Sequence, residues 1–151
     1  MEKPHYPIIN SEEGFSYEFD SISELKTIRK VVVYLPYSND DKIYQLAFGN
    51  LLENGSIDIY DKSANKDMKM VLATVIRTLL DFLSLHPDKS VIFTGSTDTR
   101  TRLYRATISK LFDSLEDILF VKGITFELEE EAFDKTKDYY AFLISRKNGK
   151  N

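Results

Sequence analysis

Hydrophobic residues recur three and four positions apart in two long stretches of the chain, which is the spacing of an amphipathic helix. The first stretch runs from residue 66 to about residue 85, and its apolar positions are Val71, Leu72, Val75, Ile76, Leu79, Leu80 and Leu83. The second follows Gly95, runs to about residue 115 and carries the stripe Tyr104, Ile108, Leu111, Phe112 and Leu115. Pro87 ends the first stretch, because proline disfavours the helical conformation in the residue before it. The pattern predicts two helices.

Shorter stretches alternate apolar and polar residues or are rich in β-branched residues, and both patterns are typical of strands. We expect strands over residues 15–19, over residues 27–35 with Pro36 as the stop, and from residue 43 toward Glu53. Asn54 and Gly55 follow, and this pair predicts a hairpin with a type I′ turn, in which both central residues have positive φ.

A short apolar strand over residues 91–94 separates the two predicted helices. After the second helix, two alternating segments predict a closing antiparallel pair. Their apolar positions are Ile124, Phe126 and Leu128 in the first segment and Tyr140, Phe142 and Ile144 in the second. Alternation also predicts that six aromatic side chains are buried: Tyr17, Phe19, Tyr44, Phe48, Phe126 and Phe142.

This order of elements predicts an α+β fold, with a mostly antiparallel sheet of about six or seven strands and two main helices packed on one face. The chain contains no internal repeat and no linker rich in proline or glycine. We therefore expect a single globular domain over residues 1–151, with a polar tail at 147–151 that frays.

Composition removes several kinds of chemistry. The 151 residues include no cysteine, which excludes disulfides, thiolate zinc sites, iron–sulfur clusters and a cysteine nucleophile. Only two histidines are present, far apart in the sequence, which argues against a histidine-rich metal centre and leaves a site made of carboxylates alone open. We expect no metal and no other cofactor. The start of the chain has no secretory-signal pattern. The longest apolar segment of the whole chain is interrupted by Arg77 and Asp81. We therefore expect a cytoplasmic protein without membrane contact.

Charge is unevenly distributed along the chain. The net charge of −4 and the pI near 5.2 argue against general electrostatic attraction to nucleic acid. One segment is nevertheless basic, with Arg100, Arg102, Arg105 and Lys110, and another is acidic, with Glu127, Glu129, Glu130, Glu131 and Asp134. A local basic pocket is compatible with an acidic protein.

The basic segment begins where the second helix is predicted to begin. A helix N-terminus already carries roughly +0.5 of an elementary charge, so arginines are expected near the other end. Arginines at this end therefore repel the helix dipole unless an anion is bound. Alternatively, Ser96, Thr97 or Asp98 caps the helix and the arginines form ion pairs with the acidic segment near Glu129.

The run Gly95-Ser96-Thr97 with Arg100-Thr101-Arg102-Leu103-Tyr104-Arg105 is also the most specific part of a family resemblance. Four segments carry this resemblance through nearly the whole chain: Tyr17-Glu18-Phe19, Leu46-Ala47-Phe48-Gly49, residues 69–75 and Tyr140-Ala141-Phe142-Leu143. The chain resembles a family of uncharacterised bacterial proteins, common in Bacteroidota, that form a domain of unknown function. The resemblance implies a domain and lends no activity.

The leading hypothesis is a small binding module for a phosphate-bearing ligand, a nucleotide or a nucleic-acid segment, at the N-terminus of the second helix. Three kinds of donor would contact the ligand. They are the guanidinium groups of Arg100, Arg102 and Arg105, the backbone amides of Gly95 and Ser96, and the hydroxyls of Ser96 and Thr97, with Tyr104 beside them.

Two alternatives belong to other classes. One is a metal-independent RNase-like toxin, as in a toxin–antitoxin pair, or another phosphodiester-cleaving enzyme, in which Asp98 or Tyr104 transfers a proton. The other is a protein–protein interaction module that binds a small partner protein or a second copy of the chain through its basic and acidic segments.

Overall fold

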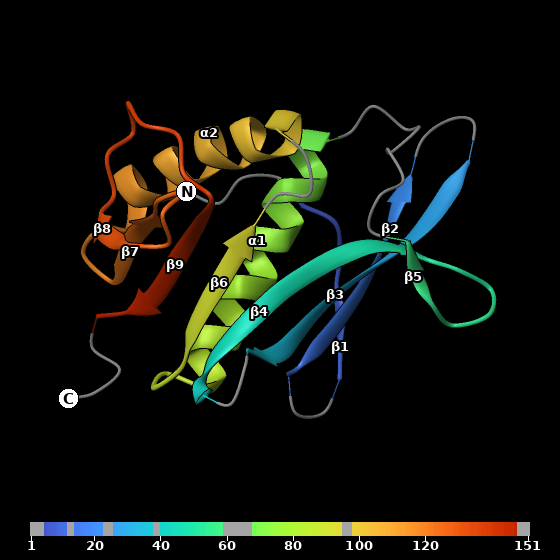
Figure 1. Ribbon diagram of the computed structural model, residues 1–151. Coiled ribbons are helices and arrows are strands. Elements are labelled where there is room, and N and C mark those ends of the chain that lie inside the picture. Colours follow the sequence, from blue (N-terminus) through green and yellow to red (C-terminus); the bar gives the residue numbers. More distant parts are fainter. Residues whose placement is uncertain are drawn as a thin grey trace. The chain divides into compact units, whose positions relative to one another are not determined.

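Figure 1 shows the computed structural model of the chain. It describes residues 5–11, 14–22, 26–37, 40–58, 68–94 and 98–147, and for Asp40, Met68 and residues 98–104 and 111–112 it describes the backbone alone. The chain divides into two compact units. Unit 1 comprises Met1–Leu35 and Ala47–Leu85, and unit 2 comprises Pro36–Leu46 and His86–Asn151.

The fold is α+β, as the sequence predicts. The helices of the described residues are α1 (Met68–Leu85) and α2 (Asp98–Leu115). The strands are β1 (Ile9–Asn10), β2 (Ser16–Ile22), β3 (Thr27–Tyr37), β4 (Asp40–Leu51), β5 (Ile57–Asp58), β6 (Ser90–Thr94), β7 (Leu119–Ile124), β8 (Glu130–Ala132) and β9 (Ala141–Arg146).

Hydrogen bonds join the strands in the order β1-β2-β3-β4-β6-β9-β7-β8, and β5 pairs with β4. The sheet is mostly antiparallel, with a parallel pair formed by β4 and β6. Within the described residues it has nine strands rather than the six or seven predicted. The difference arises because β1 and β8 are only two or three residues long, too short to show an alternating pattern.

Unit 1 buries one face of the β2–β3 ladder against α1. Tyr17 and Val32 are opposite each other in this ladder, and both are fully buried. Two positions after Val32, on the same face of the strand, Tyr34 stacks on Phe82 of α1, with ring centroids 4.3 Å apart. The Tyr34 hydroxyl also bonds to Thr78 Oγ1 at 2.8 Å. Alternation along the strand and the helical repeat of α1 therefore meet in one core, as the sequence predicts.

The buried face of α1 contains two threonines and one aromatic residue besides the predicted leucines and valines. Val71, Leu72, Val75, Leu79 and Leu83 are buried, and so are Thr74, Thr78 and Phe82. Both threonine hydroxyls donate to carbonyls of the preceding helical turn, Thr74 to Met70 at 2.7 Å and Thr78 to Val75 at 2.7 Å. These bonds satisfy the hydroxyls and let polar residues lie in the core.

The predicted hairpin at Asn54 and Gly55 is present, but its turn is not type I′. Of these two turn residues, only Gly55 has positive φ, at 90°. The amide of Gly55 bonds to the carbonyl of Leu52 at 2.9 Å, and the amide of Leu52 bonds to the carbonyl of Ser56 at 2.9 Å. This is a turn followed by a left-handed residue, the next most common hairpin connection. Asn54 Oδ1 accepts the amide of Ser56 at 3.0 Å.

Pro36 does not stop its strand, contrary to the prediction. β3 continues through Pro36 to Tyr37. The ladder with β2 covers only the positions from Thr27 to Val33, so a proline at position 36 removes no hydrogen bond to that neighbour. Pro36 is also exposed, in keeping with the rule that proline is tolerated near strand ends.

In unit 2, β6 lies between β4 and β9. Its Val91 is beside Ile144 of β9, which in turn is beside Val121 of β7, and all three side chains are buried. Helix α2 packs against β7 and buries Ile108 completely. These contacts place the core of unit 2 between α2 and this row of strand residues.

The closing antiparallel pair exists, but its first strand lies earlier than predicted. β7 ends at Ile124 and pairs with β9 from Leu119 to Ile124. The chain then turns, so Phe126 and Leu128 are 63% and 67% exposed, and the predicted burial of Phe126 is wrong. Tyr17, Phe19 and Phe142 are buried as predicted, whereas Tyr44 and Phe48 are half-buried.

Candidate functional site

The predicted site lies where β6 leads into α2. β6 ends at Thr94 and α2 begins at Asp98. The three residues between them, Gly95, Ser96 and Thr97, lie outside the described residues. The backbone of α2 places positions 100, 102, 104 and 105 in its first turns. Arg105 is the residue among them whose side chain is described.

The helical backbone brings positions 102 and 105 close together. Residues three apart on a helix are surface neighbours, with about 5–6 Å between their Cβ atoms. Because α2 is continuous from Asp98 to Leu115, Arg102 and Arg105 have this relation. The first turn of a helix has backbone amides with no partner inside the helix, and these attract negative charge. Arg102 and Arg105 are the fifth and eighth residues of the 18-residue helix α2, about 6 Å and 10 Å from Asp98 along the helix axis.

Arg105 is held by the segment before β9. Its Nη1 donates to the carbonyl of Lys137 at 3.0 Å and forms an ion pair with the carboxylate of Asp138. The Arg105 side chain is 29% exposed and that of Asp138 is 69% exposed. The alternative in which an arginine pairs with an acidic residue of its own chain therefore applies to Arg105, although the partner is Asp138 rather than a residue near Glu129.

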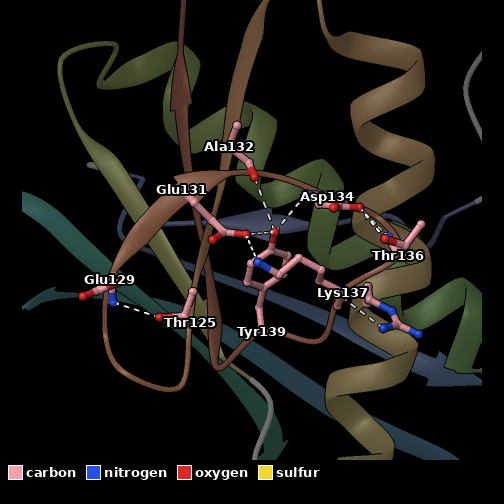
Figure 2. A network of polar contacts seen from close by, with 9 residues as sticks. Thr125, Glu129, Glu131, Ala132, Asp134, Thr136, Lys137 and Tyr139 are labelled. Atoms are coloured by element: carbon pink, nitrogen blue, oxygen red, sulfur yellow. Dashed lines mark hydrogen bonds and ion pairs between the residues drawn. The ribbon is translucent and has the colours of Figure 1, made fainter.

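Residues 131–139, called here the 131–139 loop, form a network of hydrogen bonds among themselves (Figure 2). Asp134 Oδ1 accepts the amide of Thr136 at 2.9 Å and its hydroxyl at 2.7 Å. The amide of Lys137 donates to the carbonyl of Asp134 at 3.0 Å. This turn, built around an aspartate side chain, fixes the backbone at Lys137.

A second set of bonds in the same loop converges on Glu131 and Tyr139 (Figure 2). Glu131 Oε2 accepts Lys137 Nζ at 2.6 Å and the Tyr139 hydroxyl at 2.8 Å. The Tyr139 hydroxyl in turn accepts the amide of Asp134 at 3.0 Å. The bonds from Lys137 and Tyr139 lower the pKa of Glu131, and the bond to Glu131 raises the pKa of Lys137. Both groups are therefore charged at neutral pH, which strengthens the network.

Tyr139 anchors this loop in the core of unit 2. Its side chain is fully buried, and its ring contacts those of Phe133 and Phe142 at centroid distances of 5.9 Å and 6.1 Å. Gly123 of β7 makes room for it, because a Cβ at that position would lie 2.2 Å from Tyr139 Cε1. The absence of a side chain at Gly123 thus lets the ring pack on the strand.

Strand register brings this loop to the end of β6. Thr94, the last residue of β6, pairs with Ala141, the first residue of β9. The residues just before β9 therefore lie at the same end of β6 as the start of α2. Tyr140 is 47% exposed there. An open depression borders the loop and is lined by Glu131, Ala132, Phe133, Asp134 and Lys135, so it does not include Arg105.

The sequence analysis missed Lys137, Asp138 and Tyr139. A local signal was present, since Asp134-Lys135-Thr136 has the spacing of an aspartate-capped turn. The contact between Arg105 and Asp138 spans 33 positions and leaves no local pattern.

The described residues contain no group of three or more His, Asp or Glu side chains arranged to hold a metal ion. Neither α1 nor α2, in the parts that are described, is long and apolar enough to cross a membrane.

Comparison with known proteins gives a family but no activity. No curated protein matches the chain, and no solved structure does. The sequence model of one family, described as a family of unknown function (DUF6934), matches residues 2–147. Because this match covers nearly the whole sequence, the chain belongs to the DUF6934 family.

Proposed function

We propose that the protein binds a phosphate-bearing ligand, a nucleotide or a short nucleic-acid segment, at the N-terminus of α2. The observation that carries this proposal is the way the Arg105 side chain is held. Among the described residues, the 131–139 loop holds this side chain through Nη1 alone, about two helical turns after a helix start that also carries Arg100 and Arg102. A guanidinium fixed in this way is a donor prepared for an anion.

The physical basis is the combination of two sources of positive potential. Backbone amides at a helix N-terminus point toward an anion, and the helix dipole adds to their effect. Guanidinium groups supply forked donors that match phosphate oxygens. In the proposal Arg100, Arg102 and Arg105 hold the phosphate charge. Backbone amides and hydroxyls of residues 95–97 donate to its oxygens, and Tyr104 stacks on a base.

The net charge of the chain sets a limit on this binding. A protein with a net charge of −4 repels long polyanions from most of its surface. We therefore propose recognition of one or two phosphate groups rather than a long duplex. The logarithm of the affinity should then fall only shallowly with the logarithm of the salt concentration, by about 0.7 for each phosphate contacted on a single strand.

Arg102→Ala tests the proposal. We expect this change to weaken binding of inorganic phosphate, ATP and a 5′-phosphorylated RNA oligomer by about tenfold, the loss of one charge-assisted contact. The salt dependence should become shallower, and the melting temperature should change little. Calorimetric titration at two salt concentrations measures the affinity and its salt dependence. Recovery of intact RNA after the titration shows that the protein binds the RNA without cleaving it.

Lys110→Ala is the matched control, because it removes the same charge from an exposed position later in α2. It should leave phosphate affinity within twofold of the unmodified protein. Equal losses in the two variants would show general electrostatic attraction and would contradict a site at the helix start.

A further inference from the structure

Both contacts of Arg105 engage the same nitrogen. Nη1 donates to the carbonyl of Lys137 and pairs with the carboxylate of Asp138. A guanidinium carries five N–H donors in a planar fork, and Nη1 supplies two of them. Within the described part of the chain, no contact of Arg105 involves Nε or Nη2. The edge formed by these two atoms is one that binds carboxylate and phosphate groups through two parallel hydrogen bonds.

The backbone that carries both acceptors of Nη1 is itself held in place. The carbonyl of Lys137 belongs to a backbone tied by the amide of Lys137 to Asp134 and by the Lys137 side chain to Glu131. Tyr139, on the other side of Asp138, is fully buried and bonded to Glu131. Arg105 is therefore attached through the Lys137 carbonyl to a fixed backbone, and Asp138 reaches it from that same backbone with a side chain that is 69% exposed.

We infer that Asp138 and the carbonyl of Lys137 position Arg105 so that Nε and Nη2 bind two oxygens of the ligand's phosphate group, an inference that rests on the proposed function. Asp138 is thus a positioning residue. It lowers the conformational entropy that Arg105 loses on binding. The ligand group is one with two unesterified oxygens that accept in parallel, which favours phosphate over a monatomic anion.

A carboxylate beside an anion site can instead compete with the ligand, and the geometry argues against competition here. Asp138 occupies Nη1, whereas an anion at the opposite edge of the guanidinium has no need to displace it. The Asp138 side chain is 69% exposed, so water and salt screen its charge. The positioning effect is therefore expected to exceed the repulsion.

The experiment measures inorganic phosphate binding by calorimetry for the full chain and five variants, one of them a control. Asp138→Ala removes the acceptor and should weaken binding about three- to tenfold, the cost of immobilising one long side chain. Asp138→Asn keeps an acceptor oxygen and should bind within twofold of the unmodified protein. In an Arg105→Ala background, Asp138→Ala should have no further effect, because the residue acts through Arg105.

Asp113→Ala is the control variant. Asp113 pairs with Lys135 at 3.3 Å on the surface of the same unit, and both side chains are more than half exposed. The variant removes the same charge without touching Arg105 and should leave phosphate affinity unchanged. A second readout needs no ligand. Nitrogen-15 relaxation of Arg105 Nε should show a more mobile side chain in Asp138→Ala and an unchanged one in Asp113→Ala.

Three results would overturn the inference. Tighter phosphate binding by Asp138→Ala would show that Asp138 competes with the ligand. Unchanged affinity in Asp138→Ala, with binding by the unmodified protein intact, would remove the positioning role alone. Absence of phosphate binding by the unmodified protein would overturn the proposed function and this inference together.

Discussion

Tyr17 shows how a single polar atom affects stability in unit 1. Its side chain is fully buried, and its hydroxyl is the buried side-chain polar atom without a hydrogen-bond partner among the described residues. Burial raises the pKa of Tyr17 to about 12, and the charge of Asp81 acts in the same direction. A buried donor that lacks a partner costs about 1–3 kcal/mol, because it gives up its bonds to water without replacement.

Tyr17→Phe should therefore raise the free energy of unfolding at pH 7 by about 1 kcal/mol. Tyr34→Phe is the matched comparison, because the Tyr34 hydroxyl bonds to Thr78 Oγ1 at 2.8 Å. Loss of that bond should lower the free energy of unfolding by about 1 kcal/mol. Urea denaturation of the two variants measures the difference, and a lower stability for Tyr17→Phe would show that its hydroxyl has a partner.

The raised pKa of Tyr17 also determines how the free energy of unfolding changes at high pH. Above about pH 10 the tyrosines of the unfolded chain ionise, whereas folded Tyr17 keeps its proton until about pH 12. The unfolded state therefore loses its protons at a lower pH than the folded state. The free energy of unfolding is unaffected by this ionisation below about pH 10 and falls as pH rises above it, by up to about 1.4 kcal/mol per pH unit for each such tyrosine. Burial raises the pKa of Tyr34 as well. Tyr17→Phe should thus show a shallower decline than the unmodified protein, and an identical decline would contradict this assignment.

At the scale of elements, two hairpins have the same turn but carry different residues at the position where φ is positive. In the β4–β5 connection, the amide of Gly55 bonds to the carbonyl of Leu52. In the β7–β8 connection, the amide of Leu128 bonds to the carbonyl of Thr125 at 2.8 Å. Gly55 and Leu128 both have positive φ, 90° and 65°. This conformation is natural for glycine and costs a non-glycine residue roughly 1–2 kcal/mol.

Exchanging residues at these equivalent positions tests this comparison. A Cβ at position 55 would meet nothing within 4 Å, so Gly55→Ala changes backbone conformational energy alone and should lower stability by about 1 kcal/mol. Leu128 is 67% exposed, so Leu128→Gly loses little buried surface. The variant relieves the cost of positive φ but gains conformational entropy in the unfolded chain, and the net effect should raise the free energy of unfolding by about 0.5 kcal/mol. Thermal melts of both variants give the signs, and stabilisation by Gly55→Ala would contradict the account.

The same turn explains where sequence patterns predict elements and where they fail. The helical repeat gives α1 and α2 nearly to the residue, since an apolar stripe on a helix has few alternatives. Phe126 and Leu128 alternate like strand residues, but a left-handed backbone at Leu128 turns the chain away from β7. A leucine carries no local sign of that conformation, so the error could not be avoided from pattern alone.

The same distinction applies to the candidate site. The arginine positions and the start of α2 follow from local sequence, because a strand, a glycine and a helical stripe succeed one another. The support of Arg105 by Lys137 and Asp138 does not follow, because it depends on β9 returning beside β6. Tertiary pairing of strands brings these distant residues together.

At the scale of the whole molecule, several charges of the described residues are balanced by pairs within the fold. Arg29 pairs with Glu18 at 2.9 Å and with Asp20 at 2.8 Å, and Lys137 pairs with Glu131 at 2.6 Å. With a net charge of −4, the protein has no excess positive charge to attract anions in general. The proposed function therefore requires a local anion site, which it places at the start of α2.

The most direct measurement is a titration of the nitrogen-15-labelled protein with inorganic phosphate, followed by backbone amide chemical shifts. Phosphate binding at the start of α2 should give saturable shifts that are largest for residues 95–105 and for Asp138, with small shifts in β2 and β3 of unit 1. The Arg102→Ala variant should need about tenfold more phosphate for the same shifts. Shifts that do not saturate, or that are largest outside the start of α2, would contradict a phosphate site there.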